Sequence, residues 1–274
     1  MGWHRALLLL GLLCSCNTRR EVPGAGKLSD LRGFCDEWAT RACNDTVVEQ
    51  CSAASKNACI QGQQAFCETL IPESKYSELT ASDCLDAVEA AYKDAVLTAD
   101  ERDTVVHLAG KCSKIVSGSG GAGRACTVDG DCNRDEDLSC VKKDKPTGKC
   151  EKATEANGGF SCSADEVVCA ADFYCDGAHC LAAMQQGETC SVTVPCDAES
   201  QCLDPDGNPV TLAATSDSGA AEGTCEARAT AGGSCKRDDD CKTRICSPRA
   251  GTTTGVCSTK ITLSPTDPTC TNLQ

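Results

Sequence analysis

The chain has 274 residues, with a formal charge of -14, 26 cysteines and only 3% aromatic residues. So few aromatic rings exclude a large conventional core, and dense cysteine is typical of exported proteins held together by disulfides. The acidic charge excludes the basic face that nucleic-acid binding requires, so we expect no nucleic-acid partner.

The N-terminus carries the pattern of an export signal. Arg5 precedes a short apolar run, residues 6–13, which has about half the length needed to cross a bilayer. The sequence "LCSC", which ends at Cys16, resembles the lipobox of bacterial lipoproteins: a branched apolar residue three places before the modified cysteine and a small residue directly before it. The resemblance implies that residues 1–15 are a signal peptide, that Cys16 carries a diacylglycerol, and that residues 16–27 form a tether.

This resemblance predicts a membrane-anchored protein of the cell envelope. We expect an outer-membrane lipoprotein, held by its N-terminal lipid and exposed to the periplasm or the cell surface. The alternative is an ordinary secretory signal and a secreted protein. Either location is oxidising. A zinc protein of the cytosol is disfavoured, because no C-x-x-C motif follows Cys16 and only His107 and His179 remain.

Residues 28–116 have the periodicity of short helices. Apolar residues and cysteines recur at helical spacing, and four helices in two hairpins are expected, over residues 28–43, 52–70, 80–96 and 98–115. Thr80 with Asp83, and Thr98 with Glu101, have the spacing of capping boxes that open the last two helices.

Five cysteines of this half recur every eight residues: Cys35, Cys43, Cys51, Cys59 and Cys67. A fold near Cys51 would pair Cys35 with Cys67 and Cys43 with Cys59, whereas one continuous helix would spread the thiols around its circumference. The arrangement resembles the twin-cysteine hairpins of coiled-coil-helix-coiled-coil-helix proteins. The alternative is that the equal spacing is accidental.

Two further pairings follow from symmetry and from counting. Cys84 and Cys112 are separated from Thr98 by the same number of residues in the sequence, so a second hairpin that turns near Thr98 would pair them. The cysteines beyond Cys16 are even in number, and Cys51 and Cys270 are left over. We therefore expect a disulfide that ties the C-terminal tail, residues 258–274, to the helical half.

Residues 117–123, "SGSGGAG", are predicted to be a flexible joint. Four units with the opening Gly-x-x-Cys follow over residues 124–257. The cysteines of the four units are, in order, Cys126, Cys132, Cys140 and Cys150; Cys162, Cys169, Cys175 and Cys180; Cys190, Cys196, Cys202 and Cys225; Cys235, Cys241, Cys246 and Cys257.

The units resemble the cysteine-rich N-terminal module of Dickkopf proteins and repeats of exported myxobacterial proteins. The resemblance is carried by the Gly-x-x-Cys opening, by "DGDC" or "DDDC" before the second cysteine, and by a glycine near the last. No receptor-binding role is carried over. Each unit is too small for a core and needs two disulfides, for which three pairings are open. The glycine near the last cysteine predicts a tight turn with positive φ.

The predicted fold class is therefore small and disulfide-rich. An N-terminal all-α domain of helical hairpins stapled by disulfides precedes four small four-cysteine repeats with short β-hairpins and loops. The longest gap inside a unit, residues 203–223, is expected to be a surface loop.

The sequence shows no catalytic signature. Neither a Gly-x-Ser-x-Gly elbow, a phosphate loop nor a His-Glu-x-x-His motif occurs, so neither an enzyme nor a cofactor is expected. His107 is predicted to be a helix residue and His179 a turn residue. Calcium is an alternative at two acidic runs, although both lack the glycine of an EF-hand and turns and solvated loops are the favoured interpretation: Asp129, Asp131, Asn133, Asp135 and Asp137, and Asp204, Asp206 and Asn208.

The predicted function is thus a non-enzymatic one, in which a rigid frame presents a binding or structural surface to an unknown protein or an envelope polysaccharide. A secreted hydrolase inhibitor is the alternative, with Arg249 in the loop 247–255 as its specificity residue. A calcium-dependent adhesion module is the third hypothesis.

Overall fold

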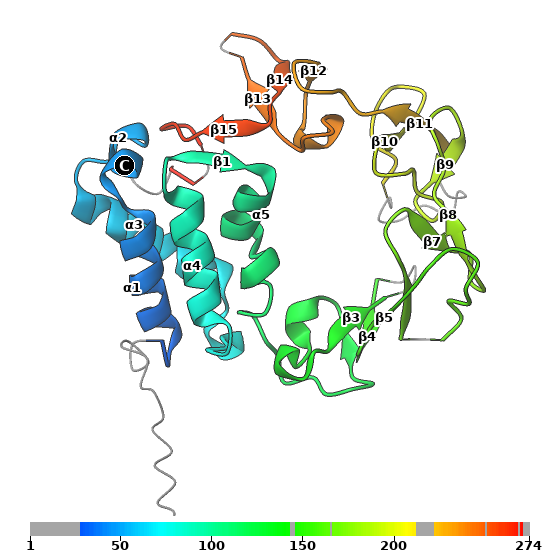
Figure 1. The fold of residues 1–274 in the computed structure, drawn as a ribbon, viewed down its shortest axis with the longest axis horizontal. Coiled ribbons are helices and arrows are strands. Elements are labelled where there is room, and N and C mark those ends of the chain that lie inside the picture. The colour runs from blue at the N-terminus through cyan, green and yellow to red at the C-terminus, as the bar shows by residue number, and fades with distance from the viewer. Residues whose placement is uncertain are drawn as a thin grey trace, which may run out of the picture.

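A computed structural model of the chain describes residues 28–142, 146–164, 166–211, 222–249, 251–267 and 269–270. The predicted signal peptide, the tether and Cys16 lie outside the described residues. Residues 212–221 of the predicted surface loop also lie outside them. The described chain follows a ring: a helical domain is succeeded by four cysteine-rich repeats that run in an arc and return to the helices (Figure 1).

The helical domain contains five helices, which confirms the expected all-α start of the chain. They are α1 (Leu31–Ala42), α2 (Asp45–Gln50), α3 (Lys56–Leu70), α4 (Ala81–Tyr92) and α5 (Ala99–His107), with 3₁₀ turns η1 (Glu73–Lys75) and η2 (Gly110–Cys112). Helices α1 and α3 lie side by side, and α4 packs against α1 (Figure 1). The hairpin of α1 and α3 is the one that the eight-residue cysteine spacing predicts.

Helix α2 was not expected. Its N-cap is Asn44, whose side-chain oxygen accepts a hydrogen bond from the N–H of Val47 at 3.0 Å. The Asn44 amide also donates to the carbonyl of Tyr92 at 2.8 Å. A single Asn thus starts a six-residue helix and ties it to α4, which explains how the chain reverses between α1 and α3.

One of the two predicted capping boxes is present. Thr98 accepts from the N–H of Glu101 at 3.3 Å, and the Glu101 carboxylate accepts from the N–H of Thr98 at 2.8 Å, so α5 begins as expected. The prediction for Thr80 is wrong, because its side chain caps nothing and its buried hydroxyl has no partner.

The third helix is shorter than expected. Helix α4 ends at Tyr92, and Ala95 takes a left-handed φ of 56°, so that the chain leaves the helix. The next residues form strand β1 (Val96–Thr98). The last predicted helix also breaks, at Leu108, whose φ is 54°.

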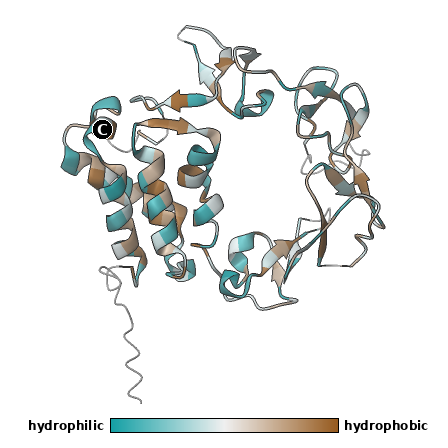
Figure 2. Cartoon of the chain, viewed as in Figure 1, coloured by the Kyte–Doolittle hydropathy of each residue, from teal (hydrophilic) through white to brown (hydrophobic). Residues whose placement is uncertain are grey.

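The apolar core lies in the helical domain. Trp38, Phe34, Leu85 and Tyr92 are fully buried there together with the helical cysteines. Figure 2 shows strand β1 as apolar, and its Leu97 is fully buried in the same cluster. Among the described residues, the fully buried aromatic side chains all lie in this domain.

Each repeat folds around small strands. Repeats 1, 3 and 4 each have a three-stranded antiparallel sheet in which the last strand is central, and repeat 2 has two two-stranded sheets. The strands are β2 (Ala125–Cys126), β3 (Ser139–Val141) and β4 (Gly148–Glu151); β5 (Thr154–Ala156), β6 (Val167–Cys169), β7 (Phe173–Cys175) and β8 (Cys180–Ala182); β9 (Thr189–Ser191), β10 (Ser200–Leu203) and β11 (Glu222–Ala227); β12 (Ser234–Cys235), β13 (Cys246–Pro248) and β14 (Gly255–Cys257). Repeat 1 also has turns η3 (Asp129–Asp131) and η4 (Arg134–Glu136), and repeat 4 has η5 (Asp238–Asp240).

The glycine that opens each Gly-x-x-Cys unit has a specific conformational role. All four have left-handed φ angles, between 78° and 88°, and each donates its N–H to the carbonyl of the last cysteine of its unit at 2.8–2.9 Å: Gly123 to Cys150, Gly159 to Cys180, Gly187 to Cys225 and Gly232 to Cys257. An L side chain is strained at this φ, so the opening glycine fixes how each repeat closes.

The glycine near the last cysteine acts differently from the prediction in three repeats. Gly148, Gly223 and Gly255 lie in strands without a positive φ, and a Cβ on any of them would lie 2.1–2.5 Å from a carbonyl oxygen of the neighbouring strand. Close backbone approach therefore requires these glycines. In repeat 2, Gly177 does take a positive φ, 101°.

The segment predicted as a flexible joint belongs to repeat 1. Ser117 donates its N–H to the carbonyl of Lys75 at 2.7 Å, and Gly118 donates to that of Cys132 at 2.8 Å. A Cβ on Gly118 would lie 2.3 Å from the carbonyl oxygen of Asp131. The glycines permit this close contact, so they join the helical domain rigidly to the repeat.

The C-terminal segment closes the ring. Strand β15 (Lys260–Thr262) pairs antiparallel with β1, and Leu263 is buried in the helical core. The buried side chain of Gln63 accepts from the indole N–H of Trp38 at 3.1 Å and donates to the carbonyl of Thr269 at 3.1 Å. The disulfide Cys51–Cys270 fixes the end of the described chain next to α2.

Ring closure can be measured by cutting the chain once. A specific protease site inserted after Lys152, whose side chain is 71% exposed, lies between Cys150 and Cys162, where no disulfide within a repeat spans the cut. We expect the cut protein to run as one species on a denaturing non-reducing gel and as two after reduction.

The matched control is Cys51→Ser with Cys270→Ser, which should give two fragments without reduction. The same double variant should lose about 2–4 kcal/mol of stability, the typical contribution of one disulfide. Separation of the fragments of the cut parent chain before reduction would contradict the closed ring.

Candidate functional site

Every cysteine from Cys35 to Cys270 lies in a disulfide. The helical domain contains the expected pairs Cys35–Cys67, Cys43–Cys59 and Cys84–Cys112, and the expected link Cys51–Cys270 joins it to the tail. In each repeat the first cysteine pairs with the third and the second with the fourth: Cys126–Cys140 and Cys132–Cys150, Cys162–Cys175 and Cys169–Cys180, Cys190–Cys202 and Cys196–Cys225, Cys235–Cys246 and Cys241–Cys257.

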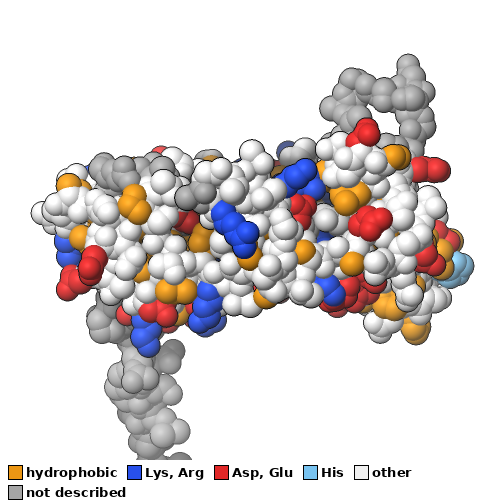
Figure 3. Space-filling model, turned by 90° about the horizontal axis from the view of Figure 1, so that it is seen from above, with side chains coloured by type: hydrophobic (Ala, Val, Ile, Leu, Met, Phe, Trp, Pro, Cys, Tyr) orange, Lys and Arg blue, Asp and Glu red, His pale blue; other side chains and the backbone are white. Residues whose placement is uncertain are grey.

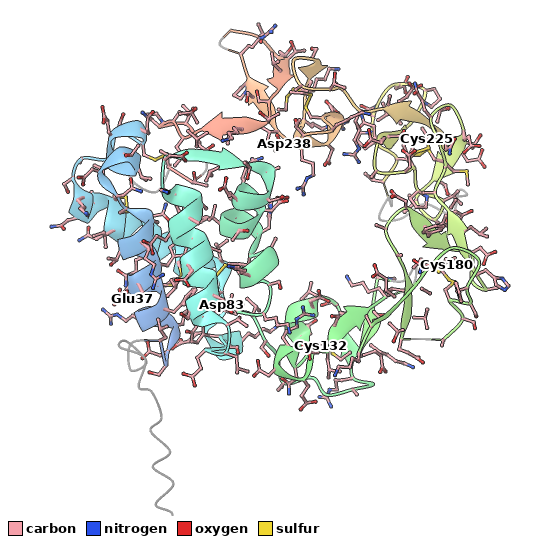
Figure 4. All side chains as sticks on the ribbon, viewed as in Figure 1. Glu37, Asp83, Cys132, Cys180, Cys225 and Asp238 are labelled. Atoms are coloured by element: carbon pink, nitrogen blue, oxygen red, sulfur yellow. A yellow bond between two sulfur atoms is a disulfide. The ribbon has the colours of Figure 1, made fainter. Side chains whose placement is uncertain are left out.

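This pairing selects one of the three connectivities that the sequence left open. Figure 4 shows Cys132, Cys180 and Cys225 in successive positions along the arc, one in each of repeats 1 to 3. In each described repeat, three sulfur atoms lie within 4.8 Å of one another, but all belong to disulfides and none is a thiolate ligand.

Repeats 1 and 4 share one aspartate turn. The carboxylate before the second cysteine accepts two backbone N–H groups in both repeats, at 2.7–3.1 Å: Asp131 from Thr127 and Val128, and Asp240 from Lys236 and Arg237. Two residues earlier, Asp129 accepts from the N–H of Cys140 and Asp238 from that of Cys246, at 2.8 and 2.7 Å. The same frame thus carries Thr127 and Val128 in repeat 1 but Lys236 and Arg237 in repeat 4.

Repeat 1 docks on the helical domain through this turn. Lys75 donates to the Asp131 carboxylate at 2.7 Å, and this bond, with those from Thr127 and Val128, holds the pKa of Asp131 well below its usual range. Ser77 donates to Asp135 at 3.0 Å. Lys114 pairs with Asp137 and lowers the pKa of that carboxyl.

The candidate calcium ligands serve these structural contacts. In the first run, Asp129, Asp131, Asp135 and Asp137 each face a different protein donor, as given above, and Asn133 caps η4. In the second run, Asp204 accepts the N–H groups of Asp206 and Asn208 at 2.9 and 2.8 Å, which makes a turn. Both runs thus form turns, as the sequence favours, and the first run also makes docking contacts that were not expected.

The other candidate residues lie apart from one another. His107 is exposed at the end of α5, with its Nδ1 3.3 Å from the Asp103 carboxylate, and His179 lies in the turn before β8. Arg249 is exposed after β13, and its carbonyl accepts the N–H of Thr252 at 3.2 Å in a turn. The inhibitor hypothesis, which depends on Arg249, stays a prediction.

Charge is divided unevenly around the ring. Residues 153–227, which form repeats 2 and 3, contain 13 acidic residues and neither Lys nor Arg. Residues 228–260, around repeat 4, contain seven Lys and Arg against three Asp. Figure 3 shows Lys and Arg side chains over the middle of the ring edge, with acidic side chains and a His at its right-hand end. Repeat 4 therefore carries a net positive charge directly after the acidic repeats 2 and 3.

Ion pairs hold repeat 4 to the helical domain. Arg102 of α5 donates to the Asp238 carboxylate at 2.5 Å, and Arg244 pairs with Asp100 and Asp103. Asp238 marks the point where repeat 4 meets the helices (Figure 4). Both end repeats thus dock on the same domain. Repeat 1 supplies mainly acids to these contacts, whereas repeat 4 supplies both an acid, Asp238, and a cation, Arg244.

A pocket of about 520 Å³ lies at this junction, within the size range of small-ligand sites. Its walls come from α5, repeat 4, β15 and the loop that follows, and three of its charged side chains are cations: Arg102, Lys236 and Arg237. A second pocket of about 360 Å³ lies between repeats 3 and 4 and shares Lys236 and Arg237. Sequence reasoning missed these residues, although the contrast with the cation-free stretch before them was a visible signal.

No protein-family model, no curated protein and no solved structure matches the chain. The resemblance to Dickkopf-type modules therefore stays a prediction. In the part of the chain that the structure describes, no helix is both long enough and apolar enough to span a membrane.

The docking of repeat 1 predicts a pH-dependent stability. Because the pKa of Asp131 is lower in the folded chain, its contribution is present above the unfolded value of about 3.9 and is lost as the pH falls below it towards the folded value. Asp131→Asn should destabilise the oxidised protein at pH 7 by about 1 kcal/mol, and the difference from the parent should shrink below about pH 4.

Thermal unfolding of both proteins between pH 7 and pH 2 measures this difference. Asp206→Asn, at an exposed turn of repeat 3, is the matched control and should follow the parent. A difference for Asp131→Asn that stays constant down to pH 2 would contradict the assigned role.

Proposed function

We propose that the protein is a non-enzymatic lipoprotein of the cell envelope that presents a disulfide-stabilised binding surface outside the cytoplasm. Its mature chain begins at Cys16, whose lipid holds the ring at a membrane. Its partner is a protein or a polysaccharide of the envelope.

The single observation that carries this proposal is the complete pairing of the described cysteines in twelve disulfides. Such a set of cross-links is typical of chains that fold in oxidising, extracytoplasmic compartments. The disulfides hold the repeats without a large core, so the side chains between cysteines are free to serve recognition.

The arrangement of polar side chains supports binding more than catalysis. Among the described residues, His107 and His179 lie on different domains, and the carboxylates with lowered pKa serve turns or docking contacts. A catalytic site needs an acid, a base or a nucleophile that converge on one cavity. The junction pocket instead combines charged and hydroxyl groups that suit ligand recognition.

Lipid labelling tests the anchor. When the full chain is expressed in a bacterium with the lipoprotein pathway and labelled with palmitate, we expect label in the parent and a membrane-bound mature form. Cys16→Ser should abolish the label and release the protein or leave its precursor. Cys14→Ser is the matched control and should keep the label, because it preserves the pattern before Cys16.

If the parent chain is exported but carries no label, the lipid anchor is wrong and the secreted alternative holds. The intact mass of native material checks the compartment independently, since each disulfide removes two hydrogen atoms. A mass that corresponds to free thiols would overturn the extracytoplasmic assignment.

A further inference from the structure

The junction pocket exists only because the ring closes. Arg102 comes from α5 in the helical domain, Lys236 and Arg237 come from repeat 4, and Thr262 comes from β15. These residues are far apart in the sequence and meet only where the tail returns.

The charged side chains of the pocket differ in whether a protein group of opposite charge is paired with them. Asp238 accepts from Arg102 at 2.5 Å through one oxygen and from the N–H of Cys246 at 2.7 Å through the other. Asp267 accepts from the N–H and hydroxyl of Thr269 at 2.9 and 2.6 Å. Asp238 is thus paired with Arg102, and Asp267 is held by hydrogen bonds from neutral donors. Arg237 is paired with Asp240 at 2.9 Å, whereas among the described residues no ion pair holds the ammonium group of Lys236.

The remaining lining consists mainly of hydroxyl groups. Four hydroxyl-bearing residues line the pocket: Ser247, Thr262, Ser264 and Thr266. The hydroxyl oxygens of Ser264 and Thr266 lie 3.2 Å apart. The lining contains no aromatic side chain. Cys246, Pro248 and Ile261 also line the pocket, so its wall is partly apolar. The polar part offers ionic and hydrogen bonds, which suit a polyhydroxylated ligand with negative charge.

The neighbouring pocket extends the same chemistry. Lys236 and Arg237 line both cavities, and the second cavity adds the side-chain amides of Gln201 and Asn208. A ligand that lies across these two cations can occupy both cavities. This geometry fits a chain of sugars better than one isolated small anion.

We infer that the junction pocket, with Lys236 and Arg237 between its two cavities, binds an anionic polysaccharide. The inference rests on the proposed binding function and names its ligand class. The charged group of the sugar, a carboxylate or a phosphate, lies against Lys236 and the other N–H groups of Arg102, whose Nη1 is paired with Asp238. The sugar hydroxyls face the wall that carries hydroxyl groups. Repeat 2, which lines neither cavity, opposes such a ligand only weakly at physiological salt, where the screening length is about 8 Å.

The internal homology of the repeats supplies the test variant. Lys236→Thr with Arg237→Val places on repeat 4 the side chains that repeat 1 carries at the same positions of the same aspartate turn. The backbone frame of repeat 1 already accepts these residues, so the variant is expected to fold and to keep its disulfides. Lys111→Thr, an exposed cation in η2 of the helical domain, is the matched control.

The experiment measures binding of an oligogalacturonate to the oxidised mature chain by calorimetry. The methyl ester of the same oligosaccharide tests the charge, and a phosphomannan oligosaccharide distinguishes phosphate from carboxylate. We expect the parent and Lys111→Thr to bind at least one of the two anionic sugars, and to bind the ester weakly. The double variant should bind about tenfold or more weakly, since it loses two charged contacts.

Equal affinity for the ester, or an unchanged affinity of the folded double variant, would overturn the inference. So would a lack of binding to both anionic sugars. These failures are distinct from those of the proposed function: a chain that is lipidated at Cys16 but binds neither sugar overturns the ligand class alone. A chain that binds but carries no lipid overturns the anchor alone.

Discussion

The return of the C-terminal segment to the helical domain is the constraint on which the rest of the structure depends. Strand β15 pairs with β1, Leu263 enters the helical core and Cys270 is bonded to Cys51. Linear repeat arrays are stabilised only by neighbouring repeats and need caps at both ends. Here one domain caps both ends, because Lys75 receives repeat 1 and Arg102 receives repeat 4.

The two halves of the ring are stabilised by different means. The helical domain buries Trp38, Phe34 and Tyr92, so it has a conventional core as well as disulfides. The repeats bury little besides cysteine and depend on two crossed disulfides and on an opening glycine such as Gly123. Because each repeat is closed by backbone bonds and sulfur, its other side chains can vary, which is why one aspartate turn carries Val128 in repeat 1 and Arg237 in repeat 4.

Much of this frame could be predicted from the sequence, because cysteine spacing encodes geometry directly. Symmetric spacing about Cys51 and about Thr98 gave the helical disulfides, and counting gave Cys51–Cys270. Counting thus predicted that the tail returns to the helical half, but the strand pairing that accompanies this return was not predictable, since β1 and β15 are three-residue strands without a recognisable pattern. The role of the segment at Gly118 was misjudged for a related reason: glycine permits both flexible linkers and close packing, and only the neighbouring Asp131 decides between them. The junction pocket was not predictable either, because residues of β15 line it and the position of that strand was not foreseen.

Closure and recognition are therefore coupled in this fold. Arg102 lies on one side of the junction and Lys236 on the other, so a ligand held by both contacts the closed ring and not an open one. Any such ligand stabilises the closed form by the free energy of its binding, and by linkage a ring already closed by Cys51–Cys270 binds it without the cost of bringing the two sides together. The covalent link thus contributes to affinity through preorganisation, although neither of its cysteines lines the pocket.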